Sequence, residues 1–505
     1  MENVLKNLLL AYLLIPSTAF SQYQDISKRI DSLFQVISKY KLLNGATQIM
    51  INGHTIYKSS SGYSDFAGGR SNTEMTNFAL GSVSKIFTST AILQLRDKGK
   101  LKLDDYFIKY FPEFPYSNIT IRQLLSHTSG LPDYGIFESA VAKHPEKVFN
   151  NADIIRLLRS LNQPLIFNPG EKWQYSNLNF CLLALLVEKI SGVYFKVYVR
   201  EKIFKPAGMS DTYFYTGKEN KPINQAINHD YPLFINTKPI DADSIKKTRW
   251  RTYNLNGLLG QGNIYSTIAD MIRFDQALYG TKLLKLESIK EAFTVTQLNK
   301  GIPNSTESAV GTAGYGLGWY VLRDTTFGKV VFHTGGVPGA KCMFVRNVTR
   351  KQSFILFDNA FSPNVFDIGK NILRILNTQP AEILRKTLTR DYVIALTEQG
   401  VDAAFIKLYT LKSDSLHYSL SEDEMNELGL QLLYAGKTSS HIPDALEILK
   451  LNVLLFPQSF NTYDSYGEAL AFAGKKQEAI EMYRKSLELN HQNKGGQAAL
   501  EQLLK

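Results

Sequence analysis

The order in which helical and strand-like segments follow one another most limits the fold of this sequence. A helical pattern (residues 25–41) precedes a strand pair joined by Asn52-Gly53, a dipeptide typical of tight hairpin turns. A helix-rich stretch (residues 81–190) follows, and then strand-like runs and a closing helix near Leu376. Strands and helices segregated in this way predict an α+β domain, in which helices flank an antiparallel sheet.

Beyond Thr378 the pattern changes, because the rest of the chain has only helical periodicity. The segment DALEILKLNVLLFP (444–457) parallels EAIEMYRKSLELNH (478–491) at an offset of 34 residues. A helix pair of that length is the unit of tetratricopeptide repeats, which residues 424–491 resemble. We therefore expect an all-α, repeat-like domain at 379–505.

The N-terminus has the order of a secretory signal: Lys6, an apolar run from Leu8 to Phe20, and then small residues. We expect a signal peptide of residues 1–21 with cleavage after Ser21, and hence a periplasmic or secreted protein. The alternative is an uncleaved signal that anchors the protein in the inner membrane. No later segment is long and apolar enough to span a bilayer, so no transmembrane segment is expected after signal removal.

The distribution of charge argues against nucleic-acid binding, and the cysteine content argues against a fold held together by disulfides. The formal net charge is +11, but Lys and Arg are scattered and no basic run is interleaved with aromatics, which argues against nucleic-acid binding. The two cysteines, Cys181 and Cys342, are too few and too far apart for a disulfide framework. Cys181 lies in an apolar helical pattern typical of a packed thiol, and whether the two pair is left open.

The most informative motif is GSVSK (81–85), which precedes an apolar helical pattern. Ser82 is expected at the start of that helix, with Lys85 three residues later on the same face. A serine hydroxyl becomes a strong nucleophile when a neighbour accepts its proton, and a buried, partly neutral lysine is such a neighbour. Ser-x-x-Lys alone is weak, because further copies begin at Ser38 and Ser244, so the glycine before Ser82 and the apolar helix after it carry the prediction.

A second motif is YSN (175–177), on a loop before another apolar helix. A phenol beside an ammonium has its charged form favoured, so Tyr175 is expected to relay a proton. The amide of Asn177 both donates and accepts, which suits holding the lysine and a substrate. The same letters at 116–118 are rejected, because they are followed by a predicted helix cap.

A third motif, HTGG (333–336), follows the strand-like run KVVF. Two glycines at a strand end allow a substrate backbone to approach closely. His333 and Thr334 are then expected to face the ligand as hydrogen-bond donors.

Together the three motifs resemble the penicillin-recognising serine hydrolases, which include class C β-lactamases, low-molecular-weight penicillin-binding proteins, D-aminopeptidases and related esterases. The resemblance covers about residues 30–378 and implies that residues 22–378 form the hydrolase domain. Flanking segments fit as well: LLSHTSGLPDY (124–134), NPGEKWQYSN (168–177), GQGNIYSTIADMIRF (260–274) and YGLGW (315–319).

The resemblance implies roles for individual residues. Ser82 would be acylated, with Lys85 and Tyr175 sharing the proton transfers, and the N–H groups of Ser82 and Gly336 would form an oxyanion hole. The family mechanism needs no metal and no organic cofactor. The implied substrate-binding residues are Asn177, His333, Thr334, Gly335 and Gly336.

One departure separates this chain from true β-lactamases, which carry lysine where this chain has His333. A histidine is mostly neutral at pH 7, so a β-lactam carboxylate would lose an attraction. We expect a hydrolase of small peptides, amides or esters, including substrates that contain D-amino acids. The alternatives are a β-lactamase or penicillin-binding D,D-carboxypeptidase, and an inert scaffold in which the helical repeats bind a protein partner.

Overall fold

The computed structural model describes residues 17–217, 219, 221–231, 238–435 and 441–505. The chain forms two compact units. The first runs to Asp230 and resumes at Ile240–Glu382, and the second combines Tyr231–Pro239 with Ile383–Lys505. Each unit is described by itself below.

The first unit is built on an eight-stranded sheet in which every neighbouring pair is antiparallel, as the sequence predicts. The predicted hairpin is present, and its two turn residues, Asn52 and Gly53, have the positive φ values (52° and 81°) that such a turn requires. In spatial order the strands are β10 (Thr306–Ser308), β11 (Gly311–Tyr315), β12 (Tyr320–Leu322), β13 (Val330–Val337), β14 (Ala340–Asn347), β15 (Gln352–Asp358), β1 (Gly45–Ile51) and β2 (His54–Ser61).

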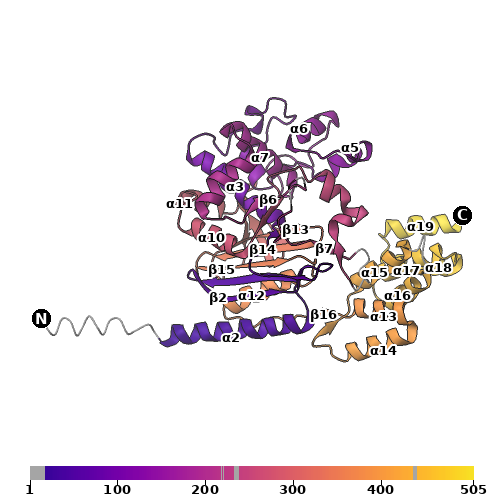
Figure 1. Ribbon diagram of the computed structural model, residues 1–505. Helices are drawn as coiled ribbons and strands as arrows, with labels where there is room; N and C mark the ends of the chain where they lie inside the picture. The colour runs from indigo at the N-terminus through magenta and orange to yellow at the C-terminus, as the bar shows by residue number, and fades with distance from the viewer. Residues whose placement is uncertain (1–16, 218, 220, 232–237, 436–440) are drawn as a thin grey trace. The chain divides into compact units, whose positions relative to one another are not determined.

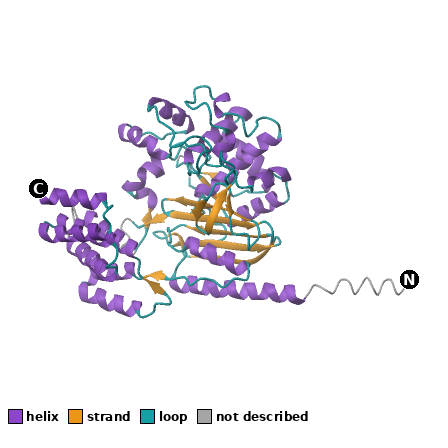
Figure 2. Cartoon of the chain, turned by 180° about the vertical axis from the view of Figure 1, so that it is seen from behind, coloured by secondary structure: helices purple, strands orange, loops and turns teal. Residues whose placement is uncertain are grey.

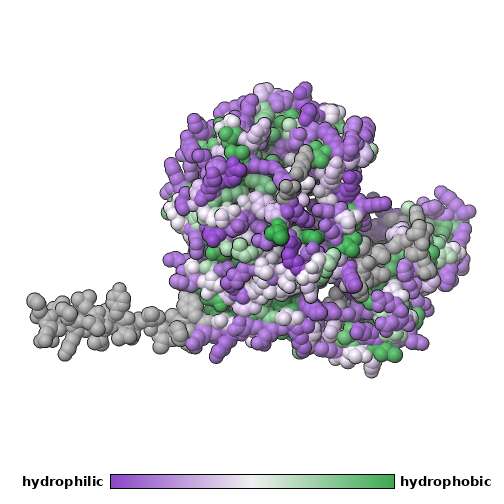
Figure 3. Space-filling model, in the orientation of Figure 1, coloured by the Kyte–Doolittle hydropathy of each residue, from purple (hydrophilic) through white to green (hydrophobic). Residues whose placement is uncertain are grey.

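Helices cover both faces of this sheet (Figures 1 and 2). On one face lie α2 (Ser17–Tyr40) and α12 (Val365–Leu376), which pack on each other. The inward side of α2 buries Ile30 and Ile37, whereas hydrophilic side chains line its outer side (Figure 3). Because the opposite face is also covered, every residue of β15 is buried, including its polar residues.

The opposite face carries a block of helices that holds the functional site. Its centre is α7 (Asn177–Ser191), which packs on α3 (Lys85–Asp97), α4 (Ile121–Leu125), α6 (Asn151–Ser160) and α8 (Phe195–Val199). Further helices are α5 (Glu138–Lys143), α9 (Lys205–Ala207), α10 (Ile268–Tyr279) and α11 (Leu286–Ala292).

Both cysteines belong to this unit, and both thiols are buried and free. Cys181 lies in α7 with no exposed surface, which confirms the interpretation of a packed thiol, and Cys342 lies in β14. The question of a disulfide is therefore answered for this structure: the two residues are not paired.

In its described residues the second unit is helical, apart from a short parallel pair between β16 (Lys386–Thr387) and β17 (Tyr418–Ser419). Gly429 of α15 lies against Leu449 of α16, and Gly467 of α17 against Tyr483 of α18, so each glycine lets two successive helices approach closely. The assignment to tetratricopeptide repeats remains a prediction. The helices are α13 (Thr389–Gln399), α14 (Val401–Lys412), α15 (Glu422–Ala435), α16 (Ile442–Leu455), α17 (Phe460–Phe472), α18 (Lys476–Leu489) and α19 (Lys494–Leu504).

Most of the predicted signal peptide (1–21) lies outside the described residues, and α2 already begins at Ser17. Across the described ranges, no single helix is long and apolar enough to cross a bilayer. One pair of consecutive helical segments, Asn177–Ser191 and Phe195–Ala207, is long and apolar enough when the two are taken together, but the pair is bent by 80°.

Candidate active site

The predicted nucleophile lies where the helical block meets the sheet. Residues Gly81–Ser84 form a tight 3₁₀ turn that leads directly into α3, so Ser82 precedes the α-helix and Lys85 is its first residue. A turn of three residues per turn places these two side chains on one side. Gly81 has φ +48°, and a Cβ there would lie 2.8 Å from the backbone nitrogen of Gly336, so this approach requires glycine.

Lys85 is completely buried and makes three hydrogen bonds. Its Nζ lies 3.0 Å from Ser82 Oγ, 2.8 Å from Asn177 Oδ1 and 3.0 Å from the carbonyl oxygen of Gln261. Burial lowers the pKa of Lys85 to about 7, while the negative charge of Asp133 opposes that shift. A lysine with such a pKa is available as a base near neutral pH.

Asp133, which the sequence argument did not single out, fixes the orientation of Asn177. Its carboxylate accepts from the Asn177 backbone N–H (3.0 Å) and from Nδ2 (2.9 Å). With Nδ2 engaged, Oδ1 faces Lys85. Asp133 is part of LLSHTSGLPDY (124–134), but only the three-dimensional structure brings it to Asn177.

Tyr175 lies against the same lysine, whose Nζ is 4.8 Å from the ring centroid. Burial raises the pKa of Tyr175 well above its ordinary value, and a hydrogen bond with Ser82 lowers it by less. The prediction that the phenolate is favoured is therefore wrong, because the loss of solvation outweighs the nearby lysine. Tyr175 is therefore protonated near neutral pH.

His127 supports Tyr175 from behind and is a second residue that the sequence argument missed. The centroids of the His127 and Tyr175 rings are 4.2 Å apart. Nδ1 accepts from the backbone N–H of Ser176 and from Asn179 Nδ2, and burial lowers the His127 pKa well below its ordinary value. A neutral ring can pack against the phenol without adding a charge beside Lys85.

The opposite wall of the site is β13, which differs from expectation in one respect. The strand does not end before His333 but continues to Val337, because β14 pairs with it along its whole length. On its other side, β12 pairs only as far as Phe332. The edge of β13 from His333 onward is consequently not paired with β12. Position 335 requires glycine, because a Cβ there would lie 2.0 Å from the Leu80 carbonyl oxygen.

His333 is buried, and both ring nitrogens are bonded inside the protein. Nδ1 donates to the carbonyl oxygen of Thr334 (2.7 Å), and Nε2 accepts from the Tyr315 hydroxyl (3.0 Å). Burial, with the charge of Lys85, lowers the pKa of His333 to about 3. The ring is therefore neutral near pH 7, and its one N–H points at the protein rather than at a ligand, contrary to the prediction.

A cleft of about 530 Å³ runs along this wall and contains Ser82, Asn177, Arg251 and Gly336. Ser82 is partly exposed, as a nucleophile must be. In the part of the chain that the structure describes, no three His, Cys, Asp or Glu side chains are grouped to hold a metal ion.

The rejected motif copies have other roles. The Tyr116 hydroxyl donates to the carbonyl oxygen of Gln163, and Thr120 caps α4, as the predicted turn and cap require. The hydroxyl of Ser244 donates to the carbonyl oxygen of Asp241, and Ser38 lies within α2.

An antiparallel sheet flanked by helices, with a serine and a buried lysine at their junction, is the architecture of the β-lactamase and transpeptidase class. The Beta-lactamase family profile matches residues 24–379. Penicillin-binding protein 4* of Bacillus subtilis (strain 168) is 33% identical over 426 residues, which cover 82% of this chain and 91% of that protein. Since residues 1–379 make up only about three quarters of the chain, this alignment extends into the helical unit.

Solved structures give the same result. The penicillin binding protein of Bacillus halodurans is 26% identical with a TM-score of 0.55, covering 67% of this chain and 97% of that chain. D-amino acid amidase from Ochrobactrum anthropi shares the fold at 22% identity and a TM-score of 0.55, over 68% of this chain and 97% of its own.

The chain belongs to the Beta-lactamase family. It is a serine hydrolase of the β-lactamase and penicillin-binding protein superfamily, whose enzymes act on small-molecule or peptide substrates.

Proposed function

We propose that this protein is an exported hydrolase that forms an acyl-enzyme on Ser82 and cleaves small peptide, amide or ester substrates. The observation that carries the proposal is the contact between Ser82 Oγ and Lys85 Nζ at 3.0 Å, together with a Lys85 pKa of about 7. A buried amine beside a partly exposed hydroxyl is the arrangement that acyl transfer needs. The apolar N-terminal run supports export to the periplasm or beyond.

Acylation follows from the protonation states. Neutral Lys85 accepts the Ser82 proton while Oγ attacks the substrate carbonyl carbon, and the N–H groups of Ser82 and Gly336 stabilise the oxyanion. Protonated Tyr175 donates to the leaving group as the scissile bond breaks, and Lys85 returns a proton to Tyr175. In deacylation a water gives its proton to the same base, and Ser82 is released with its proton restored.

The unpaired edge of β13 supports a peptide-like substrate. An extended chain can hydrogen-bond there along the backbone from His333 to Val337, in the place that β12 leaves free. The fold likeness to D-amino acid amidase supports including substrates with D-residues.

Penicillin recognition is the second candidate, because the relative with 33% identity is named a penicillin-binding protein. Neutral, internally bonded His333 offers no cation to the carboxylate of a β-lactam. We therefore expect β-lactams to acylate Ser82 slowly and to be poor turnover substrates.

The test compares nitrocefin, a D-alanyl-D-alanine peptide and p-nitrophenyl esters on the full chain, with fluorophosphonate labelling in parallel. We expect ester or peptide turnover and a label that Ser82→Ala abolishes, whereas Ser244→Ala retains it. Rapid nitrocefin hydrolysis would overturn the ranking of substrates. Folded protein that takes no label would instead favour the scaffold alternative.

A further inference from the structure

A pocket of about 920 Å³ lies at the end of α3 that is remote from Ser82. The helix begins at Lys85, and its 13 residues span about 20 Å. The lining of the pocket comes from the segments 94–98, 201–206 and 281–285. We call it the α3 pocket.

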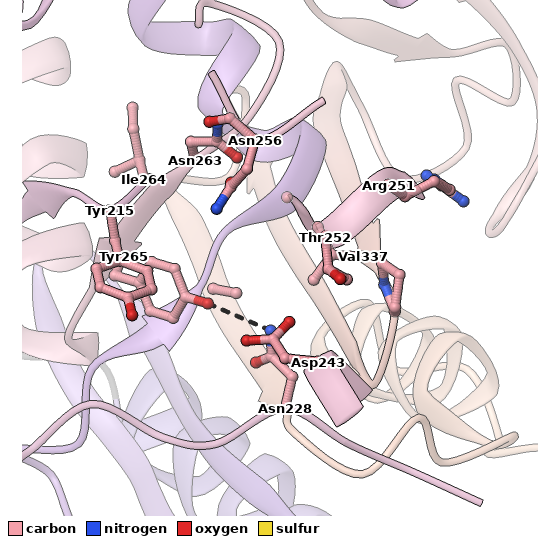
Figure 4. Close-up of a pocket in the computed structure, with 13 residues that line it drawn as sticks. Tyr215, Asn228, Asp243, Arg251, Thr252, Asn256, Asn263, Ile264, Tyr265 and Val337 are labelled. Atoms are coloured by element: carbon pink, nitrogen blue, oxygen red, sulfur yellow. Dashed lines mark hydrogen bonds between the residues drawn. The ribbon is translucent and has the colours of Figure 1, made fainter. Parts of the chain in front are cut away.

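The α3 pocket is separate from the catalytic cleft. The pocket shown in Figure 4 does adjoin that cleft, because the two share lining residues such as Gly81 and Arg251. The α3 pocket has no lining residue in common with either of them. A ligand bound in the α3 pocket therefore does not occupy the site of acyl transfer.

The end of α3 holds the three segments of the pocket together. The side-chain amide of Gln94 donates to the carbonyl oxygens of Lys202 (3.0 Å) and Leu283 (3.1 Å). The carboxylate of Asp97 accepts from the backbone N–H of Lys285 (3.3 Å). These bonds bring four lysines from three parts of the chain to one pocket: Lys98, Lys202, Lys282 and Lys285.

The four lysines are exposed, and none of them forms an ion pair with another described residue. Two carboxylates also line the pocket, but both are engaged by other cations. Asp97 pairs with Arg96 (3.1 Å). Glu201 pairs with Arg200 (3.0 Å) and Lys205 (2.7 Å). The pocket therefore holds several like charges that repel one another, and a polyanion would offset that repulsion.

The side chains of the lining indicate the class of anion. Lysine binds phosphate as a compact point charge, whereas arginine, which suits planar carboxylates, is not among the lining residues. The described lining also has no aromatic side chain on which nucleic-acid bases could stack. Its leucines, Leu283 and Leu284, are buried and offer no apolar group to a bilayer. These features favour a soluble ligand that carries several phosphate groups.

We propose that the α3 pocket binds a soluble chain of linked phosphate groups, a polyphosphate, through the ammonium groups of its four lysines. Because the pocket lies one helix length from Ser82, the bound chain leaves the catalytic cleft open. The site would hold the enzyme on an anionic material while the cleft hydrolyses small substrates.

The test measures the binding of fluorescently labelled long-chain polyphosphate to the full chain by fluorescence anisotropy, over a series of NaCl concentrations. We expect the Kd to rise with salt, with a slope of about three on logarithmic axes, because four lysines release counterions from the chain. Tripolyphosphate should compete, and orthophosphate should compete much more weakly, because a single phosphate reaches fewer lysines. Phosphatidylglycerol vesicles that compete as well as tripolyphosphate would overturn the choice of a soluble ligand.

A pocket variant tests the four lysines directly. Its affinity for polyphosphate should fall about 30-fold or more, which is the combined size of four exposed ion pairs. Its hydrolysis of a p-nitrophenyl ester should match that of the wild type. The variant carries Lys98→Gln, Lys202→Gln, Lys282→Gln and Lys285→Gln.

A control variant separates the pocket from the overall charge of +11. It loses the same number of exposed lysines outside the pocket and should retain its affinity within about threefold, because distant surface charges are screened by salt. Equal losses in the two variants would show that binding follows net charge and would overturn the site. The measurement needs no turnover, so its result does not depend on the proposed function. The control carries Lys28→Gln, Lys172→Gln, Lys300→Gln and Lys407→Gln.

Discussion

Two segments of this chain carry the same Ser-x-x-Lys spacing but differ in environment. Ser82 and Lys85 join a 3₁₀ turn to a buried helix, and the lysine, with no exposed surface, bonds the serine, Asn177 and a carbonyl oxygen. Ser244 and Lys247 lie in exposed 3₁₀ turns. The Ser244 hydroxyl donates to the carbonyl oxygen of Asp241, three residues earlier in the chain. The Ser-x-x-Lys spacing alone therefore does not make the serine a nucleophile. The lysine must also be buried and hydrogen-bonded beside the serine, as Lys85 is.

Replacing the serine of each segment by alanine is expected to give the largest difference in activity between the two segments. Ser82→Ala removes the atom that forms the acyl bond, so ester hydrolysis should fall by at least about 10⁴-fold. Ser244→Ala should retain wild-type activity. Initial rates with a p-nitrophenyl ester measure both, and equal losses in the two variants would contradict the assignment.

Lys85 should give a similarly large effect and a defined pH dependence. Its neutral form is the base, so kcat/KM should rise about tenfold per pH unit below 7 and level off above the pKa of about 7. Lys85→Met should lower activity by about 10³-fold or more, and Lys247→Met should not lower it. A wild-type profile that stays flat from pH 5 to 8 would show that another group is the base.

The same lowered pKa affects stability. Between pH 7 and about 10, the unfolded chain holds a proton on this lysine that the folded protein does not, because the unperturbed pKa of lysine is about 10.4. This group therefore makes the free energy of unfolding increase with pH across that window. Urea unfolding at pH 7 and pH 9.5, in the wild type and in Lys85→Met, isolates its contribution, and an equal pH slope in both proteins would refute it.

A smaller effect is expected from the two tyrosines. Tyr175→Phe removes the proton donor to the leaving group and should lower kcat by about 10²-fold, more for an amide than for an ester with a good leaving group. Tyr116→Phe loses only the bond to the Gln163 carbonyl oxygen and should affect stability alone. Amide and ester turnover by both variants distinguishes a proton donor from a packing residue.

The smallest effect is expected from Asp133, which acts through Asn177. Asp133→Asn should lower kcat/KM about tenfold, because Asn177 loses the acceptor that orients it. It also removes a negative charge that raises the Lys85 pKa, so the acid limb of the pH profile should move to lower pH. A loss of activity with an unmoved limb would mean that Asp133 has only a structural role.

Much of the fold was predictable because its signals are local. Asn52-Gly53 specifies the hairpin, Thr120 caps α4, and the change of periodicity near Thr378 precedes the helical unit. The length of β13 was not predictable. The strand continues through His333 because it pairs with β14, and the segment KVVFHTGG contains no signal for that pairing.

The sequence named residues for the candidate site but did not give their electrostatics. Three motifs named Ser82, Lys85 and Tyr175, and the structure brings their segments together. The direction of the Tyr175 pKa shift was predicted wrongly, because the degree of burial is a property of the assembled core. Asp133 and His127 were missed for the same reason: their roles depend on contacts with Asn177 and Tyr175 that only the folded chain makes.

The most direct measurement is to quench the full chain during turnover of a p-nitrophenyl ester and map the trapped acyl group by mass spectrometry. Trypsin should release residues 71–85 as one peptide, which contains Ser71, Ser82 and Ser84, so fragmentation must assign the serine. The account predicts the added acyl mass on Ser82 alone. An acyl group on another residue, or a burst of released leaving group with no covalent adduct on the protein, would contradict it.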